Sequence, residues 1–205
     1  MARDTTSIVK RSRREGYALH PKAHKALMKR TTMPGKAANQ MSRNKPSQYS
    51  LQLREKQKVK RLYGLLEKQF SKLMAEASRT RGQSGATLLQ FLEQRMDNVV
   101  YRAGYATSRP GARQLVTHGH FMLNGRRVDI PSIRLKEGDE VVLRDHSKTN
   151  EYFKNLEELS PAPAAVPTWL KVNRKKLSVT VSGLPTRDDA EPDIKEQLIV
   201  EYYSR

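Results

Sequence analysis

The side chains with the most chemistry to offer are arginines and amides gathered in one short stretch. Six of them lie within residues 109–127: Arg109, Arg113, Gln114, Asn124, Arg126 and Arg127. A guanidinium group offers forked N–H donors that match phosphate oxygens, and its flat face stacks on bases. Because folded RNA is recognised largely through shape, phosphates and 2′-hydroxyls, this stretch predicts an RNA-binding surface.

Two histidines in the same stretch raise the question of catalysis. His118 and His120 flank Gly119, and imidazoles are common acid–base groups in enzymes. No serine or cysteine nucleophile motif accompanies them, and no carboxylate pair is placed beside them by spacing. We therefore expect no catalytic residue, and we interpret both histidines as stacking or phosphate contacts. Asp97 and Asn98, inside a predicted helix, are expected to hydrogen-bond between helices.

Positive charge is concentrated toward the N-terminus. The 205 residues include 39 lysines and arginines against 21 acidic residues, a formal net charge of +18. Residues 1–50 carry +10 of this surplus, residues 51–82 carry +6 and residues 83–146 carry +2, whereas residues 147–205 are neutral. Such a surplus attracts polyanions over long range and makes binding depend on salt. The N-terminal part is therefore expected to face the polyanion.

The composition also excludes several classes of protein. There is no cysteine, which removes disulfides and thiolate metal sites and is typical of a reducing cytoplasm. His20 and His24 alone cannot complete a tetrahedral site, so we expect no metal and no cofactor. No apolar run reaches the roughly 20 residues of a membrane span, and the first residues lack a secretory signal. The single tryptophan, Trp169, lies far from the basic half, which argues against a lipid-binding helix.

The basic N-terminal part divides into an arm and a helix. Residues 1–50 show little periodicity and are interpreted as an arm that becomes ordered on RNA, with a disordered tail as the alternative. Residues 51–79 predict one long helix, because apolar residues recur at steps of three and four. Cations crowd its first turns, where the helix dipole disfavours them and a nearby phosphate would relieve the cost. A solvated polar face is the simpler interpretation of those cations.

Two further helices and a hairpin are predicted around the arginine-rich stretch. Residues 86–103 form the first helix, and the second begins after the capping hydroxyls of Thr107 and Ser108. The arginines and the glutamine of this second helix are expected to face outward. Asn124-Gly125 between short strands is the strongest short-range signal for a two-residue type I′ turn. The helix pair and the hairpin would thus form a rigid platform.

The C-terminal part is expected to contain a short helix, a linker and strands. Residues 149–159 predict the helix, and residues 160–167 (SPAPAAVP) form a stiff proline–alanine linker. Alternating apolar residues then predict strands near Trp169–Val172, Leu177–Val181 and Leu198–Tyr203. We expect Trp169 to anchor the core. The last strand is either ordinary core or an edge that meets a neighbouring protein.

Several segments resemble one known family, in order along nearly the whole chain. Residues 93–146, with RMDNVVYR at 95–102, ARQLV at 112–116, HGH at 118–120 and LNG at 123–125, look like the S-four RNA-binding module. That module also occurs in pseudouridine synthases and tRNA synthetases, so alone it does not fix the function. The other segments are similar to the bacterial small-subunit ribosomal protein S-four family: SRREG at 12–16, LQLREKQKV at 51–59, PTWL at 167–170 and LIVEYYS at 198–204.

The resemblance implies an α+β fold, in which a helical N-terminal domain carries an inserted lobe of two helices and a small β-sheet. We expect a basic arm at residues 1–50, a helical domain at 51–92, the S-four domain at 93–157 and a C-terminal segment at 158–205 that packs back on the body. Many members carry an N-terminal cysteine cluster that binds zinc, and this chain departs from that form because it has no cysteine.

The resemblance also implies a structural role in the cytoplasmic ribosome. It implies a primary binder of the 5′ domain of 16S rRNA that nucleates assembly of the small subunit and contributes to translational accuracy. It further implies a position where mRNA enters the subunit, beside ribosomal proteins S-three and S-five. On this basis Arg43 and Lys45 are expected to face incoming mRNA, and the candidate protein interface is Leu198, Val200, Tyr202 and Tyr203.

The residues expected to bind rRNA are basic, histidine and amide side chains of the arm, the long helix and the S-four module. In the arm and the long helix they are Arg3, Lys10, Arg11, Arg13, Arg14, Arg54, Lys56, Lys58, Lys60 and Arg61. In the module they are Arg95, Arg102, Arg109, Arg113, Gln114, His118, His120, Asn124, Arg126 and Arg127.

Two other functions compete with a ribosomal role. An rRNA-modifying enzyme could use the S-four module as an anchor, but outside residues 93–146 the sequence shows no cofactor loop and no catalytic dyad. A free-standing RNA chaperone or a repressor of mRNA translation would also be basic. Stoichiometric co-sedimentation with the small subunit separates these alternatives from a ribosomal protein.

Overall fold

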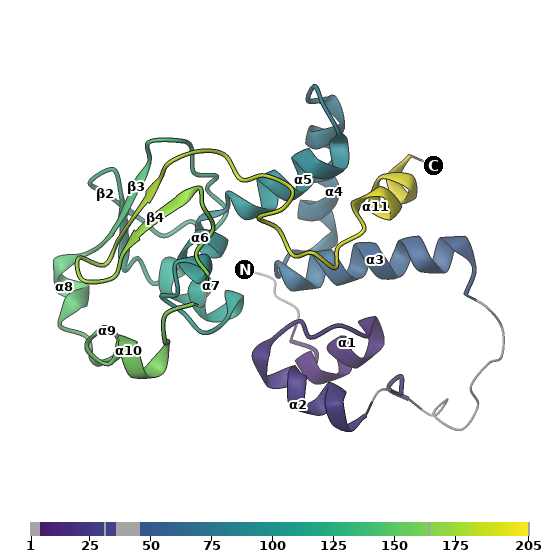
Figure 1. Ribbon diagram of the computed structural model, residues 1–205, viewed down its shortest axis with the longest axis horizontal. Helices are drawn as coiled ribbons and strands as arrows, with labels where there is room; N and C mark the ends of the chain where they lie inside the picture. Colours follow the sequence, from purple (N-terminus) through teal and green to yellow (C-terminus); the bar gives the residue numbers. More distant parts are fainter. Residues whose placement is uncertain (1–4, 31, 36–45, 164, 205) are drawn as a thin grey trace. The chain divides into compact units, whose positions relative to one another are not determined.

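The structure, a computed structural model, describes residues 5–30, 32–35, 46–163 and 165–204 in two compact units (Figure 1). The first unit comprises residues 1–85 and 193–205, and the second comprises residues 86–192. Helices make up the first unit, whereas the second combines helices with an antiparallel sheet. The α+β class expected from the sequence is confirmed.

The first unit contains five helices within the described residues, and a sixth begins at its border. They are α1 (Ile8–Glu15), α2 (Pro21–Lys29), α3 (Gln48–Leu62), α4 (Glu67–Arg79) and α11 (Glu196–Tyr203), followed at the border by α5 (Ser84–Glu93). Helix α1 packs against α2 and α3, and α11 packs against α3. Figure 1 shows α11, in yellow, next to the longer α3. Fully buried side chains of this unit include Val59, Phe70 and Ile199.

The arm is more ordered than its sequence predicted, because α1 and α2 occupy much of it. Gly16 ends α1 in the left-handed conformation, with φ of 63°. The buried Ser12 hydroxyl donates to the Ile8 carbonyl oxygen and accepts from the Leu19 amide. These local hydrogen bonds bring the chain after α1 back against it, a feature that apolar periodicity does not reveal.

The expected long helix over residues 51–79 is wrong, because the chain breaks between α3 and α4. Gly64 adopts a φ of +66°, and the Leu65 amide donates to the Lys60 carbonyl oxygen as the turn closes. The apolar stripe continues across this break from Val59 to Phe70, which is why spacing alone joined the two helices. Helix α3 also begins at Gln48, so the lysines and arginines expected in its first turns lie in its middle and end. Of these, Lys60 and Arg61 lie in the last turn, where the helix dipole favours them.

The last predicted strand, Leu198–Tyr203, is also wrong: these residues belong to α11. Ile199 is fully buried, and Tyr203 follows it at a spacing of four, so one helical face turns inward. Short apolar runs fit both a strand and a helix, and packing against α3 decides for the helix.

The second unit is built on a five-stranded antiparallel sheet in the order β2-β1-β3-β5-β4. Its strands are β1 (Phe121–Leu123), β2 (Arg126–Val128), β3 (Glu140–Leu143), β4 (Leu170–Asn173) and β5 (Ser178–Val181). The turn between β1 and β2 has positive φ at Asn124 and Gly125, as a type I′ turn requires. The predicted hairpin is therefore confirmed, and the two strands predicted near residues 169–181 join its sheet through β3.

Helices α6 (Met96–Arg102) and α7 (Arg109–Thr117) pack together and share the core with one face of the sheet. The predicted cap of α7 is confirmed, because the Ser108 hydroxyl accepts from the Gly111 amide at 3.3 Å. The expected single helix over residues 86–103 is wrong. At Arg95 the chain leaves the helix to pair with Arg134, and the Met96 amide donates to the Ile133 carbonyl oxygen.

Two one-turn helices, α9 (Glu151–Lys154) and α10 (Leu156–Leu159), replace the predicted helix over residues 149–159, and a third, α8 (Asp145–Lys148), precedes them. Trp169 lies in the core with 3% of its surface exposed, as predicted. Its neighbours in that cluster include Tyr105, Phe121 and Phe153. Within the described residues, no helix is both long enough and apolar enough to cross a membrane.

Candidate nucleic-acid interface

Besides Asn124, four of the expected RNA-binding side chains are exposed on the second unit, on α7 and its end and on the β1–β2 hairpin. They are Gln114, His118, Arg126 and Arg127. A methyl group on Gly119 would come within 2.8 Å of the Arg127 Nε atom, so the absence of a side chain there lets the guanidinium lie against the end of α7. This close approach joins the hairpin and the helix end into one surface, which we call the hairpin surface.

Asn124, also expected to contact RNA, serves the fold of the hairpin. Its side-chain amide nitrogen donates to the Asp139 carboxylate at 2.8 Å, and its side-chain oxygen accepts from the Glu140 amide at 2.9 Å. Both ends of the side chain are thus used to fix the turn against the start of β3. This rigid turn holds Arg126 and Arg127 at a defined position.

Asp97 gathers two of the expected arginines inside the unit. The buried Arg95 donates from Nε and Nη2 to the two carboxylate oxygens of Asp97, at 3.0 and 2.7 Å. Arg113 lies 3.5 Å from the same carboxylate and keeps 28% of its side chain exposed. Arg95 is therefore a structural residue of the buried interior, while Arg113 can still reach a ligand.

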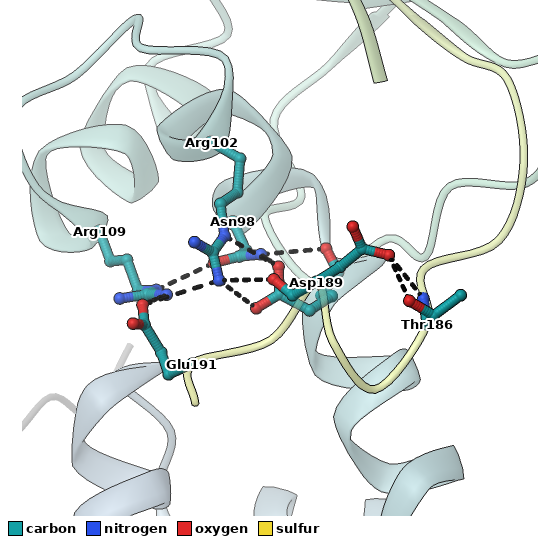
Figure 2. A network of polar contacts seen from close by, with 7 residues as sticks. Asn98, Arg102, Arg109, Thr186, Asp189 and Glu191 are labelled. Carbon is teal, nitrogen blue, oxygen red and sulfur yellow. Dashed lines mark hydrogen bonds and ion pairs between the residues drawn. The ribbon is translucent and has the colours of Figure 1, made fainter. Parts of the chain in front are cut away.

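Glu93 organises a second network with Arg102. Figure 2 shows Arg102 of this network beside Asn98 and Asp189. The Glu93 side chain has no exposed surface, and its carboxylate accepts from Arg102 Nε at 3.0 Å and Nη2 at 2.8 Å. It also accepts from the Asn98 side-chain amide at 2.7 Å. Arg102 reaches on to the Asp189 carbonyl oxygen at 3.2 Å. The expected hydrogen bonding between helices is confirmed for Asn98, whereas the Asp97 side chain accepts from Arg95 and from the Asn98 amide at the start of its own helix.

Arg109 was expected to face outward from α7, and this is wrong. Only 10% of its side chain is exposed. Its Nε donates to the Asn98 side-chain oxygen at 2.9 Å, and its Nη2 lies 2.9 Å from the Glu191 carboxylate. Figure 2 shows Asn98 and Glu191 next to the Arg109 guanidinium group. The same group lies over the ring of Tyr101, 4.6 Å from the ring centroid. Arg109 thereby ties the segment before α11 to α6 and α7.

The cations of α3 are paired with carboxylates of the first unit. Arg54 and Arg61 both pair with Glu15, whose side chain has no exposed surface. Burial raises the pKa of Glu15, although Arg54 and Arg61 oppose that rise. Lys58 pairs with Glu55 at 2.8 Å. These pairs show that much of the charge of α3 is balanced inside the protein.

Lys56 and Lys60 both pair with Glu67, at 2.7 and 2.9 Å. Lys56 is buried, and its ammonium lies 4.2 Å from the ring centroid of Tyr202. The Tyr203 hydroxyl donates to Glu67 at 2.8 Å. Burial raises the pKa of Glu67, but hydrogen bonds from Lys56, Lys60 and Tyr203 outweigh it and bring the pKa down to about 2.

The arm contributes cations of mixed exposure. Lys10 and Arg14 are exposed, whereas Arg11 is half-buried. The Arg13 guanidinium donates to the Thr32 carbonyl oxygen at 2.9 and 3.1 Å, which fixes the segment after α2. The expected contacts Arg3, Arg43 and Lys45 lie outside the described residues.

His120 differs from its neighbour His118 because it packs inward. Its Nδ1 atom lies 3.0 Å from the Ser147 hydroxyl, and its ring meets the ring of Phe153 edge-on at 5.5 Å. Burial, helped by His118 and Arg144, lowers the pKa of His120. We expect it to be neutral at physiological pH, whereas His118 is exposed at the end of α7. Among the described residues, no group of three or more metal-binding side chains is placed to hold an ion.

Comparison with known proteins shows to which family this chain belongs. The sequence model of the ribosomal protein S4/S9 N-terminal domain matches residues 3–93, and that of the S4 domain matches residues 94–141. The small ribosomal subunit protein uS4 of Roseiflexus castenholzii is 48% identical over 206 residues, covering the whole of both chains. The chain belongs to the uS4 family of small ribosomal subunit proteins.

Other uS4 proteins match over the same extent. Those of Chloroflexus aurantiacus, 48% identical over 206 residues, and Clostridioides difficile, 47% identical over 211 residues, also align over the full length of both chains. Membership of the uS4 family makes the chain a structural protein of the small subunit and not an enzyme. The resemblance seen in the sequence is thereby confirmed, and the rRNA-modifying enzyme is excluded.

Sequence reasoning missed the carboxylates that hold the arginines of this uS4 chain. Glu191 lies more than 80 residues from Arg109, so no local pattern connects them. Glu93 did carry a signal, because its spacing from Leu89 and Met96 puts it on the apolar side of the helix predicted over residues 86–103. A carboxylate at a buried helical position needs a paired cation, and Arg102 is that cation.

Proposed function

We propose that this protein binds small-subunit rRNA through the hairpin surface and nucleates assembly on the 5′ domain of 16S rRNA. The observation that carries the proposal is the exposure of Arg126 and Arg127 on a turn that Asn124 fixes from both ends. Forked donors held in place lose less entropy on binding than donors on a mobile chain. The internal pairing of Arg95, Arg102 and Arg109 supports a platform role for those residues.

Salt-dependent binding of a 16S 5′-domain transcript tests this proposal. Replacing Arg126 and Arg127 with alanine should weaken binding by about tenfold or more, since the loss of even one charge-assisted hydrogen bond costs about 1.5–3 kcal/mol. The slope of log affinity against log salt should fall by about 1 for each phosphate that the variant no longer binds. The matched control is Lys136→Ala/Lys154→Ala, which removes two exposed charges of the same unit. Equal effects in both double variants would overturn the assignment.

We further propose that α11 and the start of α3 form a protein interface facing ribosomal protein S-five. Tyr49 is 48% exposed, and its ring stacks at a tilt on Tyr202, with centroids 5.8 Å apart. Partly exposed aromatic rings are frequent anchors of protein interfaces. In this proposal Leu198, Val200, Tyr202 and Tyr203 support that anchor from α11. Tyr49→Ala should weaken association with purified S-five while leaving rRNA affinity unchanged; unchanged association would exclude the patch.

From the family resemblance we also propose two more specific roles: a part in translational accuracy, and a position beside protein S-three where mRNA enters the subunit. Arg43 and Lys45 are the candidate mRNA contacts. Subunits reconstituted with Arg43→Ala/Lys45→Ala should translate through a stable mRNA hairpin more slowly than wild type, and unchanged rates would exclude this role. The frequency of misreading by subunits that carry Tyr49→Ala, compared with wild-type subunits, tests the part in translational accuracy.

A further inference from the structure

A second concentration of positive charge lies at the α8 end of the sheet. An open depression of about 540 Å³ is lined by the side chains of Lys148, Lys175 and Lys176, with Glu140 as its one acidic lining residue. Its floor is formed by Val142 and Ser178, which face each other across β3 and β5. Their strand neighbours Val141 and Val179 are fully buried in the core, so the depression lies on the opposite, outward face of the sheet. We call it the lysine depression.

The turn that presents two of these lysines is held rigidly. Arg174 donates to the Ser160 carbonyl oxygen at 2.7 Å, and the Lys176 amide donates to the Asn173 side-chain oxygen at 3.0 Å. Leu177 has a φ of 52°, in the left-handed region that non-glycine residues rarely adopt, and its carbonyl oxygen accepts from the Leu143 amide. Backbone strain of this kind persists where neighbouring contacts over-determine the conformation. The turn therefore fixes the positions of Lys175 and Lys176.

Positive charge in the depression is available to a ligand. Within the described part of the chain, the ammonium groups of Lys175 and Lys176 have neither a hydrogen-bond acceptor nor an ion-pair partner. Lys148 lies 2.7 Å from Asp145, but 46% and 88% of these two side chains are exposed. Exposed pairs of this kind contribute little, so Lys148 can exchange Asp145 for another anion at small cost. Three cations against one lining carboxylate favour an anionic occupant.

The lysine depression lies on the same face of the sheet as Arg127 of the hairpin surface. Arg127 is paired across strands with Met122, Met122 with Val142, and Val142 with Ser178. Side chains of directly paired residues lie on the same face of a sheet. Three strand spacings separate β2 from β5, which places the two basic sites roughly 14 Å apart. A single extended polyanion can therefore contact both.

We propose that the lysine depression binds the sugar–phosphate backbone of the rRNA segment that continues from the hairpin surface. The proposal rests on rRNA binding by the hairpin surface and adds a second set of contacts to it. Ammonium groups act as point charges toward phosphate and do not read base identity. The depression thus sets the course of the RNA strand, whereas the forked arginines of the hairpin supply directional hydrogen bonds.

Footprinting of the full chain on a 16S 5′-domain transcript, combined with the salt dependence of binding, tests this inference. Lys175→Ala/Lys176→Ala should lower the salt slope by about 2, weaken binding by roughly tenfold, and remove backbone protections at a discrete group of nucleotides. Those nucleotides should adjoin the ones whose protection depends on Arg126 and Arg127. The matched control, Lys68→Ala/Lys72→Ala, removes two exposed lysines of α4 and should leave the footprint intact.

The outcomes separate the two proposals. An unchanged footprint and slope in Lys175→Ala/Lys176→Ala, with weakened binding in Arg126→Ala/Arg127→Ala, overturns the lysine depression and leaves the hairpin surface standing. Absence of any specific footprint for the wild-type chain overturns the proposed function itself. Equal weakening in both lysine pairs means that only net charge matters, which also overturns the site. Thermal unfolding of each variant checks that the fold is unaltered.

Discussion

Glu93 has no exposed side-chain surface, and its ion pair with Arg102 holds α5 and α6 together. Removing one partner of a buried pair costs about 3–5 kcal/mol, and the lower end applies here because Arg102 also lies 3.6 Å from the Glu191 carboxylate. Glu93→Gln should therefore lower the free energy of unfolding of the second unit by about that amount, measured by urea titration. Asp188→Asn, which changes an exposed acidic residue of the same unit, is the control and should be nearly neutral. A decrease below about 1 kcal/mol for Glu93→Gln would show that the network is not needed.

Single residues were predicted correctly where the sequence determines their role locally. Ser108 caps α7 because its hydroxyl needs only the backbone amide three residues ahead. Asn124 and Gly125 form the hairpin turn because both residues tolerate positive φ. Arg109 was misplaced because helical spacing on α7 says nothing about a distant carboxylate. Its partner, Glu191, comes from a segment that only the three-dimensional fold brings near.

At the scale of elements, Glu67 links α4 to α3 and α11 through Lys56, Lys60 and Tyr203. Its pKa is depressed from an ordinary value of 4.5 to about 2, so its contribution to stability is complete above pH 4.5 and disappears as pH falls to 2. Glu67→Gln should cost about 1 kcal/mol at pH 7, a modest figure because the carboxylate is partly exposed. Urea unfolding from pH 7 to pH 2 should show the two proteins converge at the acid end. Glu157→Gln is the control, and a constant difference across this range would contradict the prediction.

Helix α11 makes a second prediction at this scale. As a strand, Leu198, Val200 and Tyr202 would share the inward face, whereas in the helix Ile199 is the fully buried residue. Ile199→Ala should thus cost about 2–5 kcal/mol, more than Val200→Ala, because only the former empties a closed interior. Equal costs in urea unfolding, or the reverse order, would favour the strand.

The C-terminal ends of helices were predicted well where a glycine interrupts the periodicity. Gly104 and Gly119 closed α6 and α7, and both have positive φ. The break between α3 and α4 was not predicted, because the apolar residues keep their helical spacing on both sides of Gly64. The break at Arg95 was not predicted for another reason. It is caused by a β-bridge to Arg134, a residue too distant in the sequence for a local pattern to connect to Arg95.

At the scale of the whole molecule, the net charge of +18 correctly pointed to a polyanion, and the ordered matches along the chain identified the family. Charge counting could not show which cations are available. Arg54, Arg61 and Lys60 add to the positive total, yet all three are paired with carboxylates. Which cation pairs with which carboxylate depends on how the chain packs, so the candidate interface could be located only coarsely from the sequence.

Overall charge and local contacts should therefore affect different rate constants. Long-range attraction steers the encounter with RNA, whereas directly bonded groups hold the complex together. Lys68→Ala/Lys72→Ala reduces the net charge from +18 to +16 without touching the hairpin surface, and should slow association severalfold at low salt while leaving dissociation unchanged. Arg126→Ala/Arg127→Ala makes the same charge change, and should in addition speed dissociation by about tenfold. Surface-captured 16S 5′-domain RNA, with association and dissociation followed at two salt concentrations, measures both rates. If the two variants dissociated equally fast, the hairpin arginines would be acting only through their charge, and the directional contacts assigned to them would have to lie elsewhere.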